Sequence, residues 1–286
     1  MTRSYRSPLE SVHAWFEYLR AITSGFVIAA GRHRPAGTET SSQPDSTHAL
    51  DEDVKELTLK RESEYRMQAF HLQLPAIDPS IGMFTEESDF ASSKTLEELY
   101  DRIHCCTKCP LGATRTKFVF GTGNAAAEIV LIGEAPGADE DLQGEPFVGR
   151  AGQLLTKILA AIELTRDDVY ICNILKCRPP NNRKPLPSEV EQCSPYLYKQ
   201  LSLISPPFIV ALGLTAAEAL LSRKLKMAEL RGKWYDFYGA RLLVTYHPAA
   251  LLRNPELKRD TWEDVQRLRR AYDHYKSTGI LPEPNM

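Results

Sequence analysis

Residues 129–141 have the sequence Ile-Val-Leu-Ile-Gly-Glu-Ala-Pro-Gly-Ala-Asp-Glu-Asp, and the expected architecture of the chain follows from this stretch. Four apolar residues predict a buried strand, and the glycines, proline and carboxylates after them predict a loop. A helical pattern resumes within residues 144–155. Open α/β sheets bind their ligands beyond the carboxyl ends of strands, in loops of this kind. The glycine spacing differs from dinucleotide-binding and P-loop motifs, so the stretch indicates another kind of site.

The order of strand and then helix repeats along the rest of the chain. Apolar runs predict further strands at residues 169–174, 208–212 and 242–246, and helical spacing predicts helices at 151–162, 188–204, 215–221 and 255–275. A bent segment around 234–238 precedes the last strand. This alternation is typical of α/β proteins. We therefore predict a doubly wound, mostly parallel four-stranded sheet flanked by helices.

The first third of the chain has a different composition. Apolar residues at helical spacing between residues 9 and 28 predict an amphipathic helical extension over residues 1–35. Residues 36–94 are rich in polar residues and proline and are predicted to form a largely flexible linker. The compact domain is expected to span residues 95–286.

Composition and charge exclude several classes of protein. With 286 residues, 43% of them hydrophobic, the chain can bury a core. A formal net charge of −2 argues against a globally basic nucleic-acid coat, although a local basic patch is still compatible with it. No apolar run approaches the roughly 20 residues of a membrane span, and no secretion signal is evident, so we expect a cytoplasmic protein. Its six cysteines are then better explained as thiolate ligands or buried residues than as disulfides.

Polar residues follow three of the predicted strands. Glu134 follows the first, Asn173 lies at the end of the second, and His247 follows the last. Phe147 adds an aromatic face from the loop after the first strand. Individually, these residues are better explained as caps, turn residues or ordinary core. Parallel strands bring their carboxyl ends to one edge, however, and a carboxylate, an amide, an imidazole and an aromatic ring together suit a flat heterocycle.

Four cysteines form a second constellation. Cys106 and Cys109 make a C-x-x-C pair, and Cys177 and Cys193 complete a set of four. Four thiolates suit an iron–sulfur cluster or zinc, and spacing alone does not choose between these metals. The alternative is that Cys177 and Cys193 are structural thiols. We expect the other two cysteines, at positions 105 and 172, not to be ligands.

Basic residues gather in the segment 176–185 and on neighbouring loops. They are candidates for contacts with DNA phosphates. The alternative is that they only form a solvated surface without a specific partner. The residues concerned are Arg150, Lys176, Arg178, Arg183, Lys184 and Arg253, with Leu251 beside the last of them.

Five motifs together resemble the family 4 uracil-DNA glycosylases, the iron–sulfur branch of that superfamily. They lie at residues 106–111, 133–141, 144–155, 172–185 and 247–253, and the resemblance covers about residues 95–275. It implies a [4Fe-4S] cluster on the four cysteines named above. It also implies that uracil is flipped out of single- or double-stranded DNA, stacks on Phe147, is recognised by Asn173 and receives a hydrogen bond from His247. Glu134 is then expected to orient the attacking water or to stabilise the cationic sugar.

The loop after the first strand departs from the better known family 1 enzymes. Ala135 stands where those enzymes have a water-activating Asp, and Gly137 where they have a methyl-blocking Tyr. Gly133, Ala135, Gly137 and Glu140 are expected to border the substrate, with Glu140 or a neighbour closing the pocket against the thymine methyl. The chain also lacks the His-containing insertion of the covalently trapping relatives. We expect a monofunctional, monomeric DNA repair enzyme that leaves an abasic site, with the N-terminal extension available to a protein partner. The alternative is a non-catalytic iron–sulfur protein for DNA binding or redox sensing.

Overall fold

A computed structural model describes residues 89–222 and 226–285. The predicted N-terminal helix and most of the predicted linker lie outside these residues. The described part begins with the short 3-10 helix η2 (Asp89–Ser92), in which Phe90 is buried and packs edge-on against Tyr196, with ring centroids 5.0 Å apart. Packed structure therefore includes residues before the expected boundary at residue 95.

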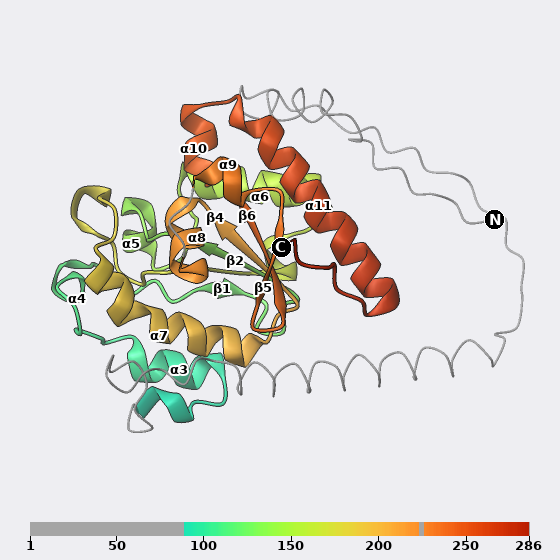
Figure 1. The fold of residues 1–286 in the computed structure, drawn as a ribbon. Coiled ribbons are helices and arrows are strands. Elements are labelled where there is room, and N and C mark those ends of the chain that lie inside the picture. The colour runs from blue at the N-terminus through green and yellow to red at the C-terminus, as the bar shows by residue number, and fades with distance from the viewer. Residues whose placement is uncertain (1–88, 223–225, 286) are drawn as a thin grey trace, which may run out of the picture. The chain divides into compact units, whose positions relative to one another are not determined.

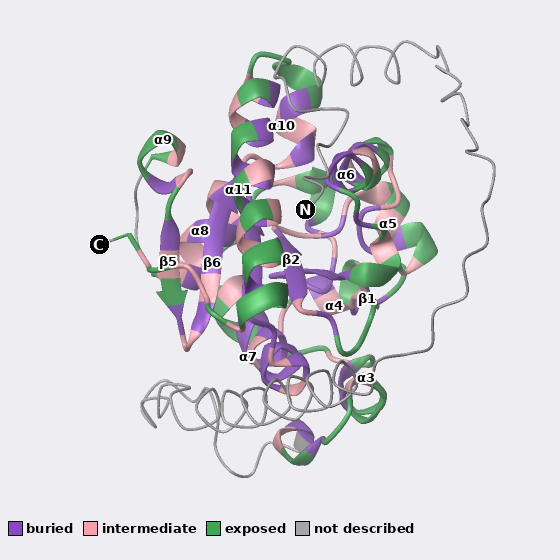
Figure 2. Ribbon diagram, turned by 90° about the vertical axis from the view of Figure 1, so that its right-hand side faces the viewer, coloured by how far each residue is buried: buried purple, intermediate pink, exposed green. Residues whose placement is uncertain are grey.

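The described residues contain one sheet of six strands, in the order β1-β3-β2-β4-β6-β5. Its four central strands are parallel: β3 (Tyr170–Asn173), β2 (Ile129–Gly133), β4 (Phe208–Leu212) and β6 (Ala240–Thr245). These are the four predicted strands. All residues of β2, β3 and β4 are buried, and Figure 2 shows β2 in the colour of buried residues.

The predicted strand count of four was wrong, because an antiparallel strand pairs with each outer edge of the parallel set. The strand β5 (Trp234–Phe237) pairs with β6 through a tight turn, and it corresponds to the bent segment expected there. On the other edge, β1 (Thr122–Gly123) pairs with β3 over two residues. Edge strands are short and only half-buried, so they lack the continuous apolar run that marks a central strand.

Helices cover both faces of the sheet (Figure 1). The helices α6 (Arg150–Ala161) and α11 (Leu257–Thr278) lie on one face, where Leu155, Ile158 and Leu268 meet side chains of β2, β4 and β6. On the other face, α3 (Leu96–Ile103), α7 (Pro187–Ile204) and α8 (Leu214–Leu221) contribute to the larger hydrophobic core. Successive strand residues point to opposite faces, so each central strand supplies both layers of core.

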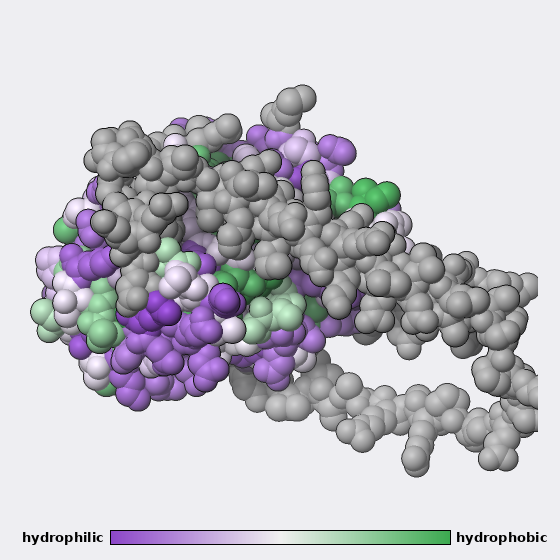
Figure 3. Space-filling model, turned by 90° about the horizontal axis from the view of Figure 1, so that it is seen from below, coloured by the Kyte–Doolittle hydropathy of each residue, from purple (hydrophilic) through white to green (hydrophobic). Residues whose placement is uncertain are grey.

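Shorter helices complete the described part. They are α4 (Leu111–Thr114), α5 (Ala138–Gln143), η3 (Arg166–Asp168), η4 (Pro180–Asn182), α9 (Met227–Leu230) and α10 (Pro248–Arg253). Three of them, α5, η4 and α10, follow the carboxyl ends of β2, β3 and β6. Among the helices of the described residues, none combines the length and apolar content that a membrane span requires. Figure 3, a view from below Figure 1, shows mostly hydrophilic side chains on the coloured surface, with separate hydrophobic patches.

The register of the sheet brings the predicted strand ends together. Gly133 at the end of β2 pairs with Asn173 at the end of β3, and Leu212 of β4 pairs with Thr245 of β6. His247 lies two residues beyond this last pair, at the start of α10. The polar residues expected at one edge of the sheet do lie along one edge.

Candidate active site

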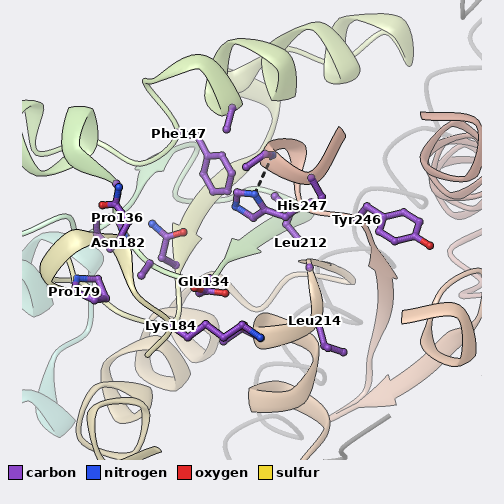
Figure 4. A pocket seen from close by; sticks show the side chains of 18 of the residues that line it. Glu134, Pro136, Phe147, Pro179, Asn182, Lys184, Leu212, Leu214, Tyr246 and His247 are labelled. Carbon is purple, nitrogen blue, oxygen red and sulfur yellow. Dashed lines mark hydrogen bonds between the residues drawn. The ribbon is translucent and has the colours of Figure 1, made fainter. Parts of the chain in front are cut away.

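A cavity of about 570 Å³ lies at the carboxyl edge of the sheet (Figure 4). Its lining includes four predicted site residues: Glu134 directly after β2, Phe147 between α5 and α6, Asn173 at the end of β3, and His247 at the start of α10. The four predicted site residues therefore converge on one cavity, which is large enough to hold a planar base with part of its sugar.

His247 is held in one tautomer by the helix that it caps. Its Nδ1 accepts a hydrogen bond from the backbone N–H of Ala249, at 3.1 Å. Burial, and to a smaller extent the positive charge of Arg253, lower the pKa of His247 to about 4. The imidazole is consequently neutral at pH 7, and because Nδ1 is an acceptor, the proton resides on Nε2. The ring thus offers one N–H donor without carrying a positive charge.

Asn173 presents an unused hydrogen-bond acceptor. Its side chain is only 2% exposed, and within the described residues its Oδ1 atom has no hydrogen-bond partner. Buried amide oxygens are normally paired, so an unpaired one beside a cavity fits a ligand that brings its own donor.

Gly133 gives Asn173 and Phe147 the space to approach each other. A Cβ atom at position 133 would lie 2.4 Å from Asn173 Oδ1 and 2.6 Å from Phe147 Cζ. Both distances are far below van der Waals contact, so a side chain here would displace the amide or the ring. The ring of Phe147 lies beside that of His247, with centroids 5.3 Å apart and planes inclined by 30°.

Glu140 connects two loops at the cavity through its carboxylate. It lines the cavity, but its carboxylate accepts hydrogen bonds from the backbone N–H groups of Gly137, Val148 and Gly149, at 3.0 to 3.1 Å. These bonds tie the loop after β2 to the loop that carries Phe147. The placement of Glu140 fits a clamp between two loops, and its action on the thymine methyl stays a prediction.

Glu134 and Ala135 follow β2 directly, and both are partly exposed at the cavity. The backbone carbonyl of Glu134 accepts the N–H of Leu175, which ties this loop to the residues that follow Asn173. Figure 4 shows the Glu134 carboxylate on the same side of the cavity as the Lys184 side chain. Ala135 contributes only a methyl group, so Glu134 is the acidic residue that directly follows the strand.

The basic residues predicted to contact phosphate have different environments. Arg183, Lys184 and Arg253 line the cavity, and Arg183 also forms an ion pair with Glu189 at 2.6 Å. Arg150 is exposed at the start of α6, and Arg178 is partly exposed, donating to Asn182 Oδ1 at 2.8 Å. These five side chains remain candidates for DNA contact.

The structure contradicts two of the predicted DNA contacts. Lys176 is 0% exposed, and its ammonium donates to the backbone carbonyl of Asn173 at 3.0 Å and to Gln200 Oε1, so no phosphate can reach it. Leu251 is also 0% exposed. Its neighbour Leu252 is 40% exposed on α10, beside Arg253, and is the leucine on this helix that DNA could touch.

Comparison with known proteins identifies the family to which this arrangement belongs. A family model of the uracil-DNA glycosylase superfamily matches residues 120–266. The chain is 47% identical to the type-4 uracil-DNA glycosylase of Archaeoglobus fulgidus over 183 residues, which are 61% of this chain and 92% of that protein. The chain belongs to the type-4 uracil-DNA glycosylases.

Two further type-4 relatives show the same coverage. Identity to the type-4 glycosylase of Thermotoga maritima is 44% over 182 residues, or 62% of this chain and 95% of that protein. Identity to the Pyrobaculum aerophilum type-4 glycosylase is 46% over 178 residues, which are 59% of this chain and 91% of that protein. The type-5 glycosylase of the latter organism is only 35% identical, over 52% of this chain and 73% of its own length.

The four cysteines predicted to be ligands differ in their burial. Cys177 and Cys193 are buried, whereas Cys106 and Cys109 are partly exposed. Burial raises the pKa of Cys193 to about 12, and the nearby Cys177 and Cys106 thiols add to the increase. Within the residues described, no group of three or more His, Cys, Asp or Glu side chains is arranged to hold a metal ion. Of the two cysteines expected not to be ligands, Cys105 is exposed and Cys172 is buried.

Three sulfur atoms of this set accept hydrogen bonds from protein donors. Cys106 Sγ accepts from the Tyr196 hydroxyl at 3.2 Å and from the Lys108 N–H at 3.5 Å. Cys177 Sγ accepts from the Arg115 guanidinium, and Cys193 Sγ from the Lys176 N–H, both at 3.3 Å. Such donors stabilise negative charge on sulfur.

Proposed function

We propose that the chain removes uracil from DNA by hydrolysing its N-glycosidic bond, leaving an abasic site. The observation that supports this most directly is the pairing of an unpartnered acceptor, Asn173 Oδ1, with a neutral donor, His247 Nε2–H, at one cavity. Uracil has an N3–H donor between two carbonyl oxygens, which is the complement of that arrangement. Phe147 supplies the face on which the ring stacks.

A base inside a duplex cannot reach this cavity, so the nucleotide must rotate out of the helix, as other enzymes that act on bases require. Single-stranded DNA avoids most of that cost. The proposed path for the phosphates follows Arg183, Lys184 and Arg253, which line the cavity, and continues over Arg150 and Arg178. Leu252, exposed on α10, would contact the bases next to the vacated position.

The bond between N1 of uracil and C1′ of the sugar breaks with its electron pair moving to the base. Negative charge then grows on the uracil oxygen that accepts the His247 N–H, while the sugar acquires oxocarbenium character. A neutral donor fixed at that oxygen interacts more strongly with the transition state than with the substrate. Water adds to C1′ and loses a proton, and the uracil anion is protonated on release.

Glu134 acts on the sugar side in this proposal. Its carboxylate would stabilise the cationic sugar or orient the attacking water, and the methyl group of Ala135 cannot do either. Because Glu140 uses its carboxylate on three backbone N–H groups, Glu134 is the better placed acidic residue for this step.

We assign Cys106, Cys109, Cys177 and Cys193 to a [4Fe-4S] cluster. The hydrogen bonds that three of their sulfur atoms accept suit cysteines that ligate iron as thiolates. When bound, the cluster would tie together the segment before β1, the segment after β3 and helix α7, and no chemical step of the proposed reaction passes through it. Its presence is tested by the iron content of purified protein.

The activity is tested with an oligonucleotide that carries one uracil. Incubation with the full-length protein followed by alkali should break the strand at that position, because alkali cleaves abasic sites. An otherwise identical thymine-containing oligonucleotide is the control. A brown protein that binds DNA but yields no breaks at any salt concentration would instead support a non-catalytic iron–sulfur DNA-binding protein.

A further inference from the structure

Phe147, the aromatic face of the proposed uracil site, has an unusual backbone conformation. Its φ angle is +56°, in the left-handed region that bulky residues rarely adopt. Such a conformation persists only where the surroundings enforce it, and it is common at functional sites. The groups that hold the two peptide units on either side of Phe147 therefore determine where its ring lies.

Arg166 binds both of these peptide units. Its Nη2 donates to the carbonyl of Pro146 at 2.9 Å, and its Nη1 donates to the carbonyl of Phe147 at 3.1 Å. The first carbonyl belongs to the peptide unit before Phe147, and the second to the unit after it. The planar, forked guanidinium can hold two neighbouring oxygens at once, which a lysine ammonium does less well.

Glu140 and Gly152 restrict the second peptide unit further. Glu140 accepts the Val148 N–H, which belongs to the same peptide unit as the Phe147 carbonyl. That unit is thus held at its oxygen by a cation and at its nitrogen by an anion. A Cβ atom at Gly152 would lie 1.7 Å from the Phe147 oxygen, so this carbonyl also packs directly against α6.

We propose that Arg166 is a positioning residue for uracil binding, which acts by holding Phe147 in its left-handed conformation. The proposal rests on the proposed function, because uracil is the ring that Phe147 would stack upon. Without the guanidinium, Phe147 can relax to a negative φ angle, which turns its ring away from His247. Arg166 lies outside every motif of the active site and begins η3, nineteen residues after Phe147.

Kinetics of the full-length protein with Arg166→Met test this role. Stacking contributes to binding of both substrate and transition state, so KM should rise about tenfold while kcat stays within about twofold. Arg166→Lys, which keeps one donor, should show a smaller rise. Arg241→Met is the matched control, since Arg241 is a partly buried arginine that binds the Pro282 carbonyl away from the site. It should leave KM unchanged.

A double variant separates positioning from general damage to the fold. If Arg166 acts through Phe147, then Arg166→Met should add nothing to the rise in KM of Phe147→Ala. An unchanged KM in a folded Arg166→Met protein, or effects of the two substitutions that multiply, would overturn the proposal. If the Met variant does not fold, Arg166→Lys carries the same test, and wild-type KM in that variant overturns it.

A crystal structure of the Arg166 variant distinguishes this proposal from the proposed function. Phe147 should have a negative φ angle there, whatever the activity of the protein. Wild-type protein that releases no uracil would refute the proposed function and leave this structural test in place. A variant in which Phe147 keeps its left-handed conformation would refute the role of Arg166 even if wild-type protein is fully active.

Discussion

His247 has two functions that substitution can separate. Its Nε2–H is the proposed donor to the leaving base, and its Nδ1 caps α10 by accepting the Ala249 N–H. Replacement by alanine removes both. Loss of a donor to developing negative charge typically costs about 3–4 kcal/mol, so kcat should fall roughly 10²- to 10³-fold. Loss of the cap should lower the free energy of unfolding by about 1 kcal/mol.

His247→Asn is the matched variant, because asparagine is one of the best N-cap residues. Its side-chain oxygen can take the place of Nδ1 at the Ala249 N–H, while its amide is too short to reach the position of Nε2. Stability should therefore return to that of the wild type, whereas kcat should remain as low as in His247→Ala. Single-turnover uracil release from an oligonucleotide and thermal unfolding measure the two quantities.

Three results would refute this reasoning. Recovery of kcat in His247→Asn would show that Nε2 is not the donor. Equal stability of wild type and His247→Ala would show that the hydrogen bond to Ala249 contributes nothing to folding. Loss of stability in both variants would mean that packing of the imidazole against Phe147, more than capping, holds the residue in place.

Three further predictions concern the site and its surroundings. Gly133→Ala should lower kcat/KM at least about tenfold and the free energy of unfolding by about 1–3 kcal/mol, because the new methyl group collides with Asn173 Oδ1. Gly137→Ala is the control and should have a smaller effect on both quantities, because its methyl group meets only the end of the Glu140 side chain. The folded protein holds His247 neutral down to its pKa of about 4, whereas unfolded chains protonate histidine near pH 6.5. The free energy of unfolding should therefore fall as the pH decreases from 6.5 to 4. In denaturant titrations, the free energy of unfolding of the wild type should fall by up to about 2–3 kcal/mol more than that of His247→Asn between pH 7 and pH 4.5. Parallel pH profiles of the unfolding free energy in the two proteins would contradict this. Cys193→Ala should lose iron and visible absorbance, while the same change at the expected non-ligand Cys172 should retain both; equal iron in the two variants would contradict the ligand assignment.

The central strands could be predicted from the sequence because they are buried on both faces and therefore apolar throughout. The convergence of Glu134, Asn173 and His247 followed from the same prediction, since parallel strands share one carboxyl edge. The edge strands could not be predicted in the same way. The strand β1 has only two residues and pairs through its backbone, which leaves almost no signal in side-chain pattern.

The errors among the predicted DNA contacts have a common physical origin. Lys176 and Leu251 lie in the right segments, but sequence does not tell which way a side chain points just after a strand or on a short helix. One residue along a helix turns the side chain by about 100°, which is the difference between buried Leu251 and exposed Leu252. Lysine side chains are almost never fully buried in proteins unless they are paired. Lys176 is an exception because the Asn173 carbonyl and Gln200 accept hydrogen bonds from its ammonium.

The supporting contacts of the site are invisible in sequence for another reason. Glu140 and Arg166 act on backbone N–H and carbonyl groups, which every residue has, so no partner residue type marks them. These contacts nevertheless hold the aromatic face, while a helix cap holds the donor. The groups that would stabilise the departing base are thus fixed before substrate binds, whereas Glu134, on the sugar side, is partly exposed. Fixed dipoles stabilise a transition state without a cost of reorganisation. With Ala135 in place of an acid, we therefore infer that this site lowers the barrier mainly through the leaving base and only secondarily through the attacking water.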